Sequence, residues 1–146
     1  MVALWVAWLG LASLGGCKRR SPGGHPDTAV RELVERLRRR GPDAADAKGA
    51  NALLSKRARD NLAARAERYV APGGKPIGPE AMLVPARAAL RFEPARYSVL
   101  KRTATSAIVE VRGLAPHEVA LVPCVLEEGS WHVDIELPPL PPVQKR

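Results

Sequence analysis

The chain changes its hydrophobic period near the middle, from a helical spacing to a strand spacing. Within residues 27–40 the apolar side chains recur three and four positions apart, at Val30, Leu33, Val34 and Leu37. This spacing predicts an amphipathic helix with one apolar stripe. Asp27 is a suitable N-cap, and Gly41-Pro42 is a suitable end.

Three further helices are predicted before residue 85. Residues 46–54 favour a short helix, and Ser55 can cap a longer one that runs to Tyr69 or Val70. Pro79 suits the first turn of another short helix, through Val84. The inner stripe of the longer helix would consist of Ala58, Leu62, Ala66 and Tyr69.

Beyond residue 94 the period is two, which predicts β-strands. Residues 95–99, 107–112 and 131–137 alternate, and residues 119–126 are apolar throughout, with a bulge expected at Pro123. Glu128-Gly129 predicts a hairpin turn. The predicted inward residues are Tyr97, Val99, Val109, Val111, Val119, Leu121, Trp131, Val133 and Ile135. On this phase the residues that face away from the helices are Ala120, Val122, Cys124 and Leu126.

Helices followed by a strand meander predict an α+β fold. We expect N-terminal helices packed on one face of a curved, cone-like, four-stranded antiparallel sheet. The domain would span residues 27–137, and a proline-rich tail would span residues 138–146. Residues 1–16 would be a signal peptide, and residues 17–26 a lipidated tether.

The N-terminal segment indicates export. Residues 2–16 carry no charge, are too short to span a bilayer, and match the hydrophobic region of a signal peptide. Leu14, Gly15 and Gly16 precede Cys17, and this order resembles the cleavage motif of bacterial lipoproteins. The resemblance implies that Cys17 carries a diacylglycerol and becomes the new N-terminus. An acyl chain such as palmitate would then anchor the protein in the cell envelope.

The resemblance to a lipoprotein signal is incomplete, because the residues before the apolar run offer no basic side chain. An ordinary cleaved signal and an uncleaved short anchor are therefore the alternatives. Under the lipoprotein interpretation, we expect the protein to be anchored in the outer membrane, on its periplasmic face.

The formal net charge of +8 raises the question of nucleic acid binding. We do not expect it, because base stacking needs aromatic side chains and few follow the signal. We expect this charge to attract anionic lipid, lipopolysaccharide or acidic polymers instead. The aromatic residues beyond the signal are Tyr69, Phe92, Tyr97 and Trp131.

No constellation in the sequence predicts catalysis, a metal or a cofactor. If Cys17 is lipidated, Cys124 has no disulfide partner in the chain and is expected to be a buried apolar residue. The histidines do not cluster as metal ligands do. Ser55 and Ser130 lack the context of a catalytic nucleophile. The three scattered histidines are His25, His117 and His132.

The order of these elements resembles the nuclear-transport-factor-like (cystatin-like) superfamily, and in particular its small bacterial lipoproteins. The resemblance is carried by the helix at 27–40, by Ala52-Leu53-Leu54-Ser55 at the next helix, and by the closing strand Trp131-His132-Val133-Asp134. It implies a cone-shaped pocket between the sheet and the helices. The pocket lining would include Tyr69, Tyr97, Val109, Val111, Leu121, Trp131 and Val133.

Three functions remain open at this point. The first is a non-catalytic, lipid-anchored protein that binds a partner or serves in assembly, as a homodimer through the sheet face or with that face covered by residues 138–142. The second is a carrier of a small apolar ligand in the cone. The third is an isomerase-like or hydrolase-like enzyme, which would need a one-residue slip of the strands to bring Glu110, His132 and Asp134 inward.

Overall fold

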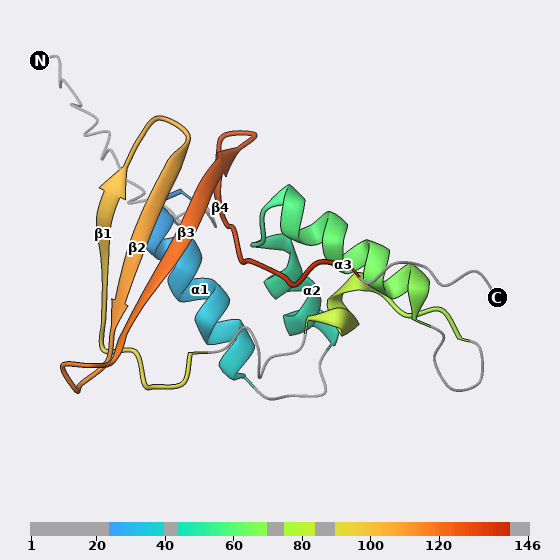
Figure 1. The fold of residues 1–146 in the computed structure, drawn as a ribbon, viewed down its shortest axis with the longest axis horizontal. Coiled ribbons are helices and arrows are strands. Elements are labelled where there is room, and N and C mark those ends of the chain that lie inside the picture. Colours follow the sequence, from blue (N-terminus) through green and yellow to red (C-terminus); the bar gives the residue numbers. More distant parts are fainter. Residues whose placement is uncertain (1–23, 40–43, 70–74, 84–89, 141–146) are drawn as a thin grey trace, which may run out of the picture.

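The computed structural model describes residues 24–39, 44–69, 75–83 and 90–140 (Figure 1). The predicted signal motif, Cys17 and the last residues of the tail, 141–146, lie outside this part of the chain. Val70 and Val84, the predicted ends of two helices, lie outside it as well. Among the described residues, none of the helices has the length and apolar character needed to cross a membrane.

The fold is α+β, as the sequence predicts. Four strands form one antiparallel sheet in the order β1-β2-β3-β4, a simple meander. They are β1 (Arg96–Arg102), β2 (Ser106–Arg112), β3 (Val119–Glu127) and β4 (Ser130–Val133). The helices precede the sheet and are α1 (Pro26–Arg38), α2 (Ala44–Ala52), α3 (Lys56–Arg68) and the 3-10 helix η1 (Pro79–Met82).

The helices divide between two places in the molecule. Helix α1 packs across one face of the sheet and contacts all four strands, whereas α3 packs with η1. Figure 1 shows α2 and α3 on the side of β4, beyond the last strand. We call the face under α1 the inner face and the opposite face the outer face. One helix therefore covers the inner face, and the other helices extend the fold sideways.

The N-cap of helix α1 lies two residues before the predicted N-cap, Asp27. Its N-cap is His25, without a side-chain capping bond, and Asp27 lies in the first turn. Pro26 explains the difference, because its fixed φ and missing N–H suit the first helical position. Asp27 still contributes there, because its charge favours the positive end of the helix dipole.

Helix α3 follows the prediction at its start and departs from it at its end. Ser55 is the N-cap, and its side chain accepts a hydrogen bond from the Ala58 amide. The predicted inner residues of α3 are buried, with one exception. Tyr69 is 50% exposed, because the helix ends at Arg68 and Tyr69 is already extended. The buried residues are Ala58, Leu62 and Ala66.

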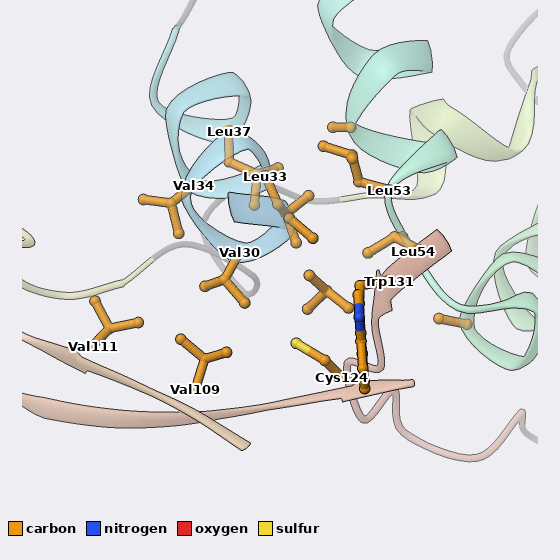
Figure 2. Packing of buried hydrophobic residues seen from close by; sticks show 14 of the residues in the cluster. Val30, Leu33, Val34, Leu37, Leu53, Leu54, Val109, Val111, Cys124 and Trp131 are labelled. Carbon is orange, nitrogen blue, oxygen red and sulfur yellow. The ribbon is translucent and has the colours of Figure 1, made fainter. Parts of the chain in front are cut away.

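The core lies between α1 and the inner face of the sheet (Figure 2). Val30, Leu33 and Val34 project from α1 toward the strand residues, and Leu54 and Trp131 close the β4 side. Each of these apolar side chains contributes roughly 1.5–3 kcal/mol when fully buried. The predicted inward residues Val109, Val111, Trp131 and Val133 all belong to this core, with 0–2% exposure.

The predicted phase of β3 is wrong. Val119 and Leu121 are 41% and 58% exposed, whereas Cys124 is buried and Ala120, Val122 and Leu126 pack against the core. Antiparallel partners point to the same face, and β2 pairs Val109 with Val122 and Val111 with Ala120. Because β3 is apolar on both faces, its own sequence could not reveal this phase.

β4 is shorter than predicted and ends at Val133. The Asp134 amide still donates to the Pro123 carbonyl at 2.8 Å. Pro123 has no N–H to donate in return, so the ladder stops at this position. The expected bulge at Pro123 does not occur, since β2 and β3 pair in unbroken register. A register shift occurs instead in β1, between Val99 and Lys101.

Candidate functional site

The end of β4 leaves part of β3 without a neighbouring strand. β4 pairs only with Cys124–Glu127, so the first half of β3 has an open edge on that side. The chain then turns away from the sheet toward α3 (Figure 1). A groove with a volume of about 880 Å³ lies between this open edge, α3, η1 and the segment after β4.

The groove has an apolar interior built by five separate parts of the described chain. Residues 120–123 of β3 form one side, and Leu62 of α3 faces them. Further lining residues are Met82, Leu83, Leu90, Ile135, Leu137 and Leu140. Ligand pockets of this kind are concave, mostly apolar and commonly 300–1,000 Å³ in volume.

The rim of the groove is polar. Arg65, Arg68, Tyr69 and Glu136 lie among the lining residues. Arg65 donates from Nε to the Asn61 side chain at 2.7 Å and from Nη2 to the Pro138 carbonyl. Its guanidinium therefore holds the segment after β4 against α3 and places a positive charge at the edge of an apolar groove.

A second arginine fixes the same segment nearer to the sheet. Arg57 Nη2 lies 3.0 Å from Asp134 Oδ2, and it also reaches the Ile135 carbonyl at 3.5 Å. Residues 138–140, predicted as a tail that covers the sheet face, instead follow α3, and Leu140 lines the groove. The predicted cover of the outer face by residues 138–142 is thus not seen for its described part.

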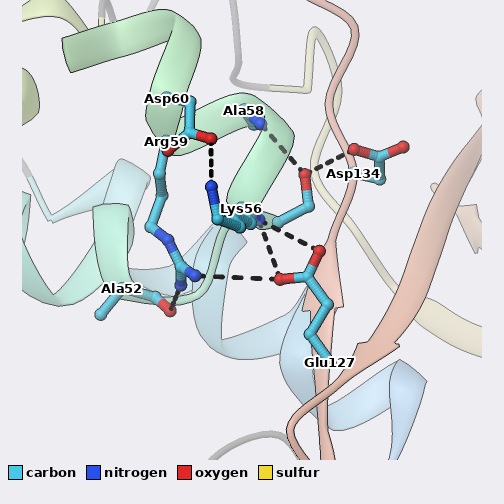
Figure 3. A network of polar contacts seen from close by, with 8 residues as sticks. Ala52, Lys56, Ala58, Arg59, Asp60, Glu127 and Asp134 are labelled. Atoms are coloured by element: carbon cyan, nitrogen blue, oxygen red, sulfur yellow. Dashed lines mark hydrogen bonds and ion pairs between the residues drawn. The ribbon is translucent and has the colours of Figure 1, made fainter.

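A polar cluster joins α3 to the ends of β3 and β4 (Figure 3). Ser55 donates from its hydroxyl to Asp134, and the Lys56 amide donates to the Glu127 carboxylate at 2.8 Å. The backbone continues this junction, since the Val133 amide donates to the Leu53 carbonyl and the Ser55 amide to the Val133 carbonyl. The start of α3 is thereby held at the edge of the sheet, and α3 becomes one wall of the groove.

Ser55 has a structural role, since both of its side-chain hydrogen bonds are made within the protein. Its hydroxyl has a single hydrogen, which it donates to Asp134, and its oxygen accepts from the Ala58 amide at 3.2 Å. The residue is 1% exposed. A serine nucleophile instead needs an adjacent base to take its proton and access for a substrate.

The predicted pocket residues do not line one pocket. Tyr69 and Leu121 line the groove, although Leu121 reaches it from the open edge of β3 and not from the inner face. Tyr97 lies half-buried under α1, with Arg31 Cζ at 4.9 Å from its ring centroid, and burial raises its pKa. The other four, Val109, Val111, Trp131 and Val133, are packed in the core.

The polar groups considered for catalysis lie apart from the core. Glu110 is on the outer face beside Arg112, whose hydrogen bond lowers the pKa of Glu110. Asp134 bonds Ser55 and Arg57. His132 is half-buried, and its Nδ1 has no hydrogen-bond partner within the described part of the protein. In that same part, no three histidine, cysteine or carboxylate side chains gather as metal ligands.

The Cys124 thiol is buried against α1. Its Sγ lies 3.9 Å from the Pro26 carbonyl oxygen, and the residue is 1% exposed. Burial raises the pKa of Cys124 to about 12, so the thiol is protonated at neutral pH. This agrees with the expectation of a buried apolar residue.

Sequence reasoning missed most of the groove. Met82 and Leu83 fall in the short helix predicted from Pro79, Leu137 ends the strand predicted at 131–137, and Leu140 lies in the predicted tail. No single local pattern brings these residues together. The apolar residues that follow Pro79 and Pro139 are the one signal that could have pointed to them. Comparison of the chain with protein-family models, curated proteins and solved structures gives no match.

Proposed function

We propose that this protein is a lipid-anchored, non-catalytic binding protein of the bacterial cell envelope. It would be held by a lipid on Cys17, at the periplasmic face of the outer membrane. Its ligand would be an apolar molecule with an acidic group, of the fatty-acid class, bound in the groove beside β3. The observation that supports this most directly is the open groove with its apolar interior and arginine-bearing rim.

The chemistry of the rim favours an acidic head group. Arg65 donates one hydrogen from Nε and one from Nη2 to groups in the described part of the chain. A guanidinium carries five N–H donors, so within that part three hydrogens, two of them on Nη1, are left for a carboxylate or phosphate oxygen. An acyl chain would occupy the apolar interior, where about 0.8 kcal/mol is gained for each buried CH₂ group.

Ligand binding can be tested with the chain that begins at residue 18, because every residue of the described core lies after Gly24. A fluorescent fatty acid should bind it saturably. Met82→Glu places a charge inside the groove and should weaken binding at least tenfold. Leu114→Glu makes the same change at a residue that is 86% exposed and outside the groove, and should leave affinity unchanged.

Two outcomes would contradict the groove assignment. One is the absence of saturable binding by the wild-type chain. The other is an equal effect of Met82→Glu and Leu114→Glu. Thermal unfolding followed by circular dichroism shows whether each variant is folded, and Leu137→Glu provides a second groove variant should Met82→Glu unfold.

The anchor is tested separately in cells. Cys17→Ala removes the thiol that would carry the lipid, and the protein should move from the membrane fraction to the soluble fraction. Mass spectrometry of the processed wild-type N-terminus should find an acylated cysteine. An unchanged membrane fraction for Cys17→Ala would reject the lipid anchor and would leave the groove assignment untouched.

We also propose kinship with the nuclear-transport-factor-like superfamily. The order of the helices and the four-stranded meander support it. The filled space between α1 and the sheet argues against a pocket of the cone type, since Val109, Val111 and Val133 are fully buried there. The proposed ligand site is therefore the lateral groove.

A further inference from the structure

The outer face of the sheet carries an apolar surface that meets the groove at Leu121 and Pro123, which line both. Alternate residues of β3 point to this face, and Ile108 of β2 stands beside Pro123. Leu121 is 58% exposed, and Leu100 in β1 is 61% exposed. The apolar residues of the outer face are Ile108, Val119, Leu121, Pro123 and Val125.

Leu100 is exposed because of the register shift in β1. Val99 pairs with Val109, and Lys101 pairs with Ile108, so Leu100 has no residue opposite it. A bulge of this kind re-aims side chains locally. The exposed Leu100 therefore precedes Lys101, which pairs with the outer-face residue Ile108.

The outer face has an excess of positive charge. Arg96 and Lys101 are exposed at the β1 edge, and both pair with outward residues of β2. The carboxylate at the centre of this face, Glu110, is bonded to Arg112 at 2.7 and 3.0 Å. The Glu110–Arg112 pair is neutral, so the charges of Arg96 and Lys101 are in excess.

Pro26, at the described end of the tether, lies at the same end of the sheet as Leu100. Arg102 pairs with Ala107, and Ala107 pairs with Cys124. Cys124 Sγ lies 3.9 Å from the Pro26 carbonyl oxygen. The first residue of α1 therefore lies near the same end of the sheet as the last residue of β1. The nine residues from Cys17 to His25 can extend about 30 Å, and three of them are basic.

We propose that the outer face of the sheet docks on an anionic lipid surface. Leu100 and Leu121 would enter the boundary between head groups and acyl chains, while Arg96 and Lys101 would meet lipid phosphates. A second copy of the chain fits this face less well, because stacking two outer faces brings like charges together. The proposal uses the anchor of the proposed function. It shares Leu121 with the groove, whereas Leu100, Arg96 and Lys101 do not line the groove.

The experiment uses the chain from residue 18, which lacks Cys17 and its lipid. This chain should sediment with vesicles that contain one third anionic lipid and should bind neutral phosphatidylcholine vesicles at least tenfold more weakly. The double variant Arg96→Glu/Lys101→Glu should lose at least tenfold in affinity. Each basic residue near an anionic surface strengthens binding about fivefold.

A matched double variant separates the effect of the outer-face residues on vesicle binding from the effect of net charge. Arg39→Glu/Lys48→Glu changes the net charge equally at two exposed residues, Arg39 directly after α1 and Lys48 in α2. It should lose less than threefold in affinity. An equal loss in both double variants would show attraction by net charge alone and would overturn the proposal.

A spectroscopic variant tests insertion directly. In the chain from residue 18, Trp131 is the only tryptophan, and it is 2% exposed. Leu100→Trp should therefore report the outer face by a blue shift of its emission when anionic vesicles are added. Sedimentation without a blue shift would contradict docking through Leu100.

The competing occupant has its own signature. If analytical ultracentrifugation shows a dimer of the wild-type chain that Arg96→Glu/Lys101→Glu converts to a monomer, the outer face belongs to a second copy and the proposal fails. A monomer in both samples, together with loss of vesicle binding in the variant, supports the membrane. Fatty-acid binding in the groove should be unchanged in this variant.

Discussion

At the scale of single residues, Ser55 is the one buried polar side chain in the described core. Its hydroxyl caps α3 and also binds Asp134 from the segment after β4. A single oxygen thus fixes the helix start and the point where the chain leaves the sheet. Both contacts shape the wall of the groove, so Ser55 affects the site through structure.

Ser55→Ala should lower the free energy of unfolding by about 1–2 kcal/mol, since an N-cap is lost and Asp134 loses a donor. Denaturant unfolding measures this change. Ser130→Ala, in the β3–β4 hairpin, is the control and should change stability by less than about 0.5 kcal/mol. Equal effects of the two substitutions would mean that the Ser55 contacts add nothing to stability.

Cys124 should make the folded protein less stable at alkaline pH. In the unfolded chain a thiol has a pKa near 8.5, whereas burial raises the pKa of Cys124 in the folded protein to about 12. The unfolded state therefore releases a proton between these values that the folded state keeps, and stability falls as pH rises through this window. Unfolding measured from pH 8 to pH 11 should show the fall.

Cys124→Ala removes this titration and should make the same pH profile flatter, at the cost of a small cavity. The slope, rather than the absolute stability, is the quantity to compare. An identical slope in both proteins would place the alkaline loss on other groups.

At the scale of elements, the β3–β4 hairpin depends on a two-residue turn with both residues at positive φ. Glu128 has φ 50° and Gly129 has φ 80°. Such turns match the twist of antiparallel strands and favour Asn-Gly. Glutamate is therefore an unfavourable residue at the first position, and glycine is the favourable residue at the second.

Two substitutions in this turn should act with opposite sign. Gly129→Ala should destabilise the fold by about 1 kcal/mol, because a side chain disfavours the left-handed backbone conformation. The added Cβ would meet no atom within 4 Å, so the cost comes from the backbone alone. Glu128→Asn should stabilise by about 0.5 kcal/mol, because asparagine tolerates this region. Thermal unfolding of the two variants checks both signs, and a shift in the same direction would contradict the turn assignment.

At the scale of the whole molecule, the fold combines a well-packed layer with a lateral unit. Helix α1 and the sheet enclose large buried residues such as Val30, Val109 and Trp131. Helix α3 buries two alanines and Leu62, packs with η1, and is joined to the sheet through the Ser55 junction. The groove lies between these two parts.

This division predicts unequal local stability. The free energy of the opening that exposes amides to solvent should be lower for the middle of α3 than for β2. Native-state hydrogen exchange measures both. Arg65→Ala, which removes the bond to the Pro138 carbonyl, should lower protection in α3 and leave β2 unchanged. Equal opening free energies for α3 and β2 would show one cooperative unit instead.

The sequence by itself determined the local features of this protein. The period of three and four residues predicted α1, and Ser55 and Glu128-Gly129 predicted a cap and a turn that the structure confirms. These features depend on residues close together in the chain, where side-chain spacing and backbone preference suffice. The motif before Cys17 is of the same local kind, and the anchor that it indicates stays a prediction.

Only the tertiary structure decided the phase of β3, the end of β4 and the groove. Residues 119–126 of β3 are all apolar, so their pattern does not indicate which side is buried, and pairing with β2 sets that side. Pro123 ends β4 only because the register brings it opposite Asp134. The groove joins Leu62, Leu121 and Leu137 from distant parts of the chain. Long-range pairing sets all three features, and no local pattern contains that information.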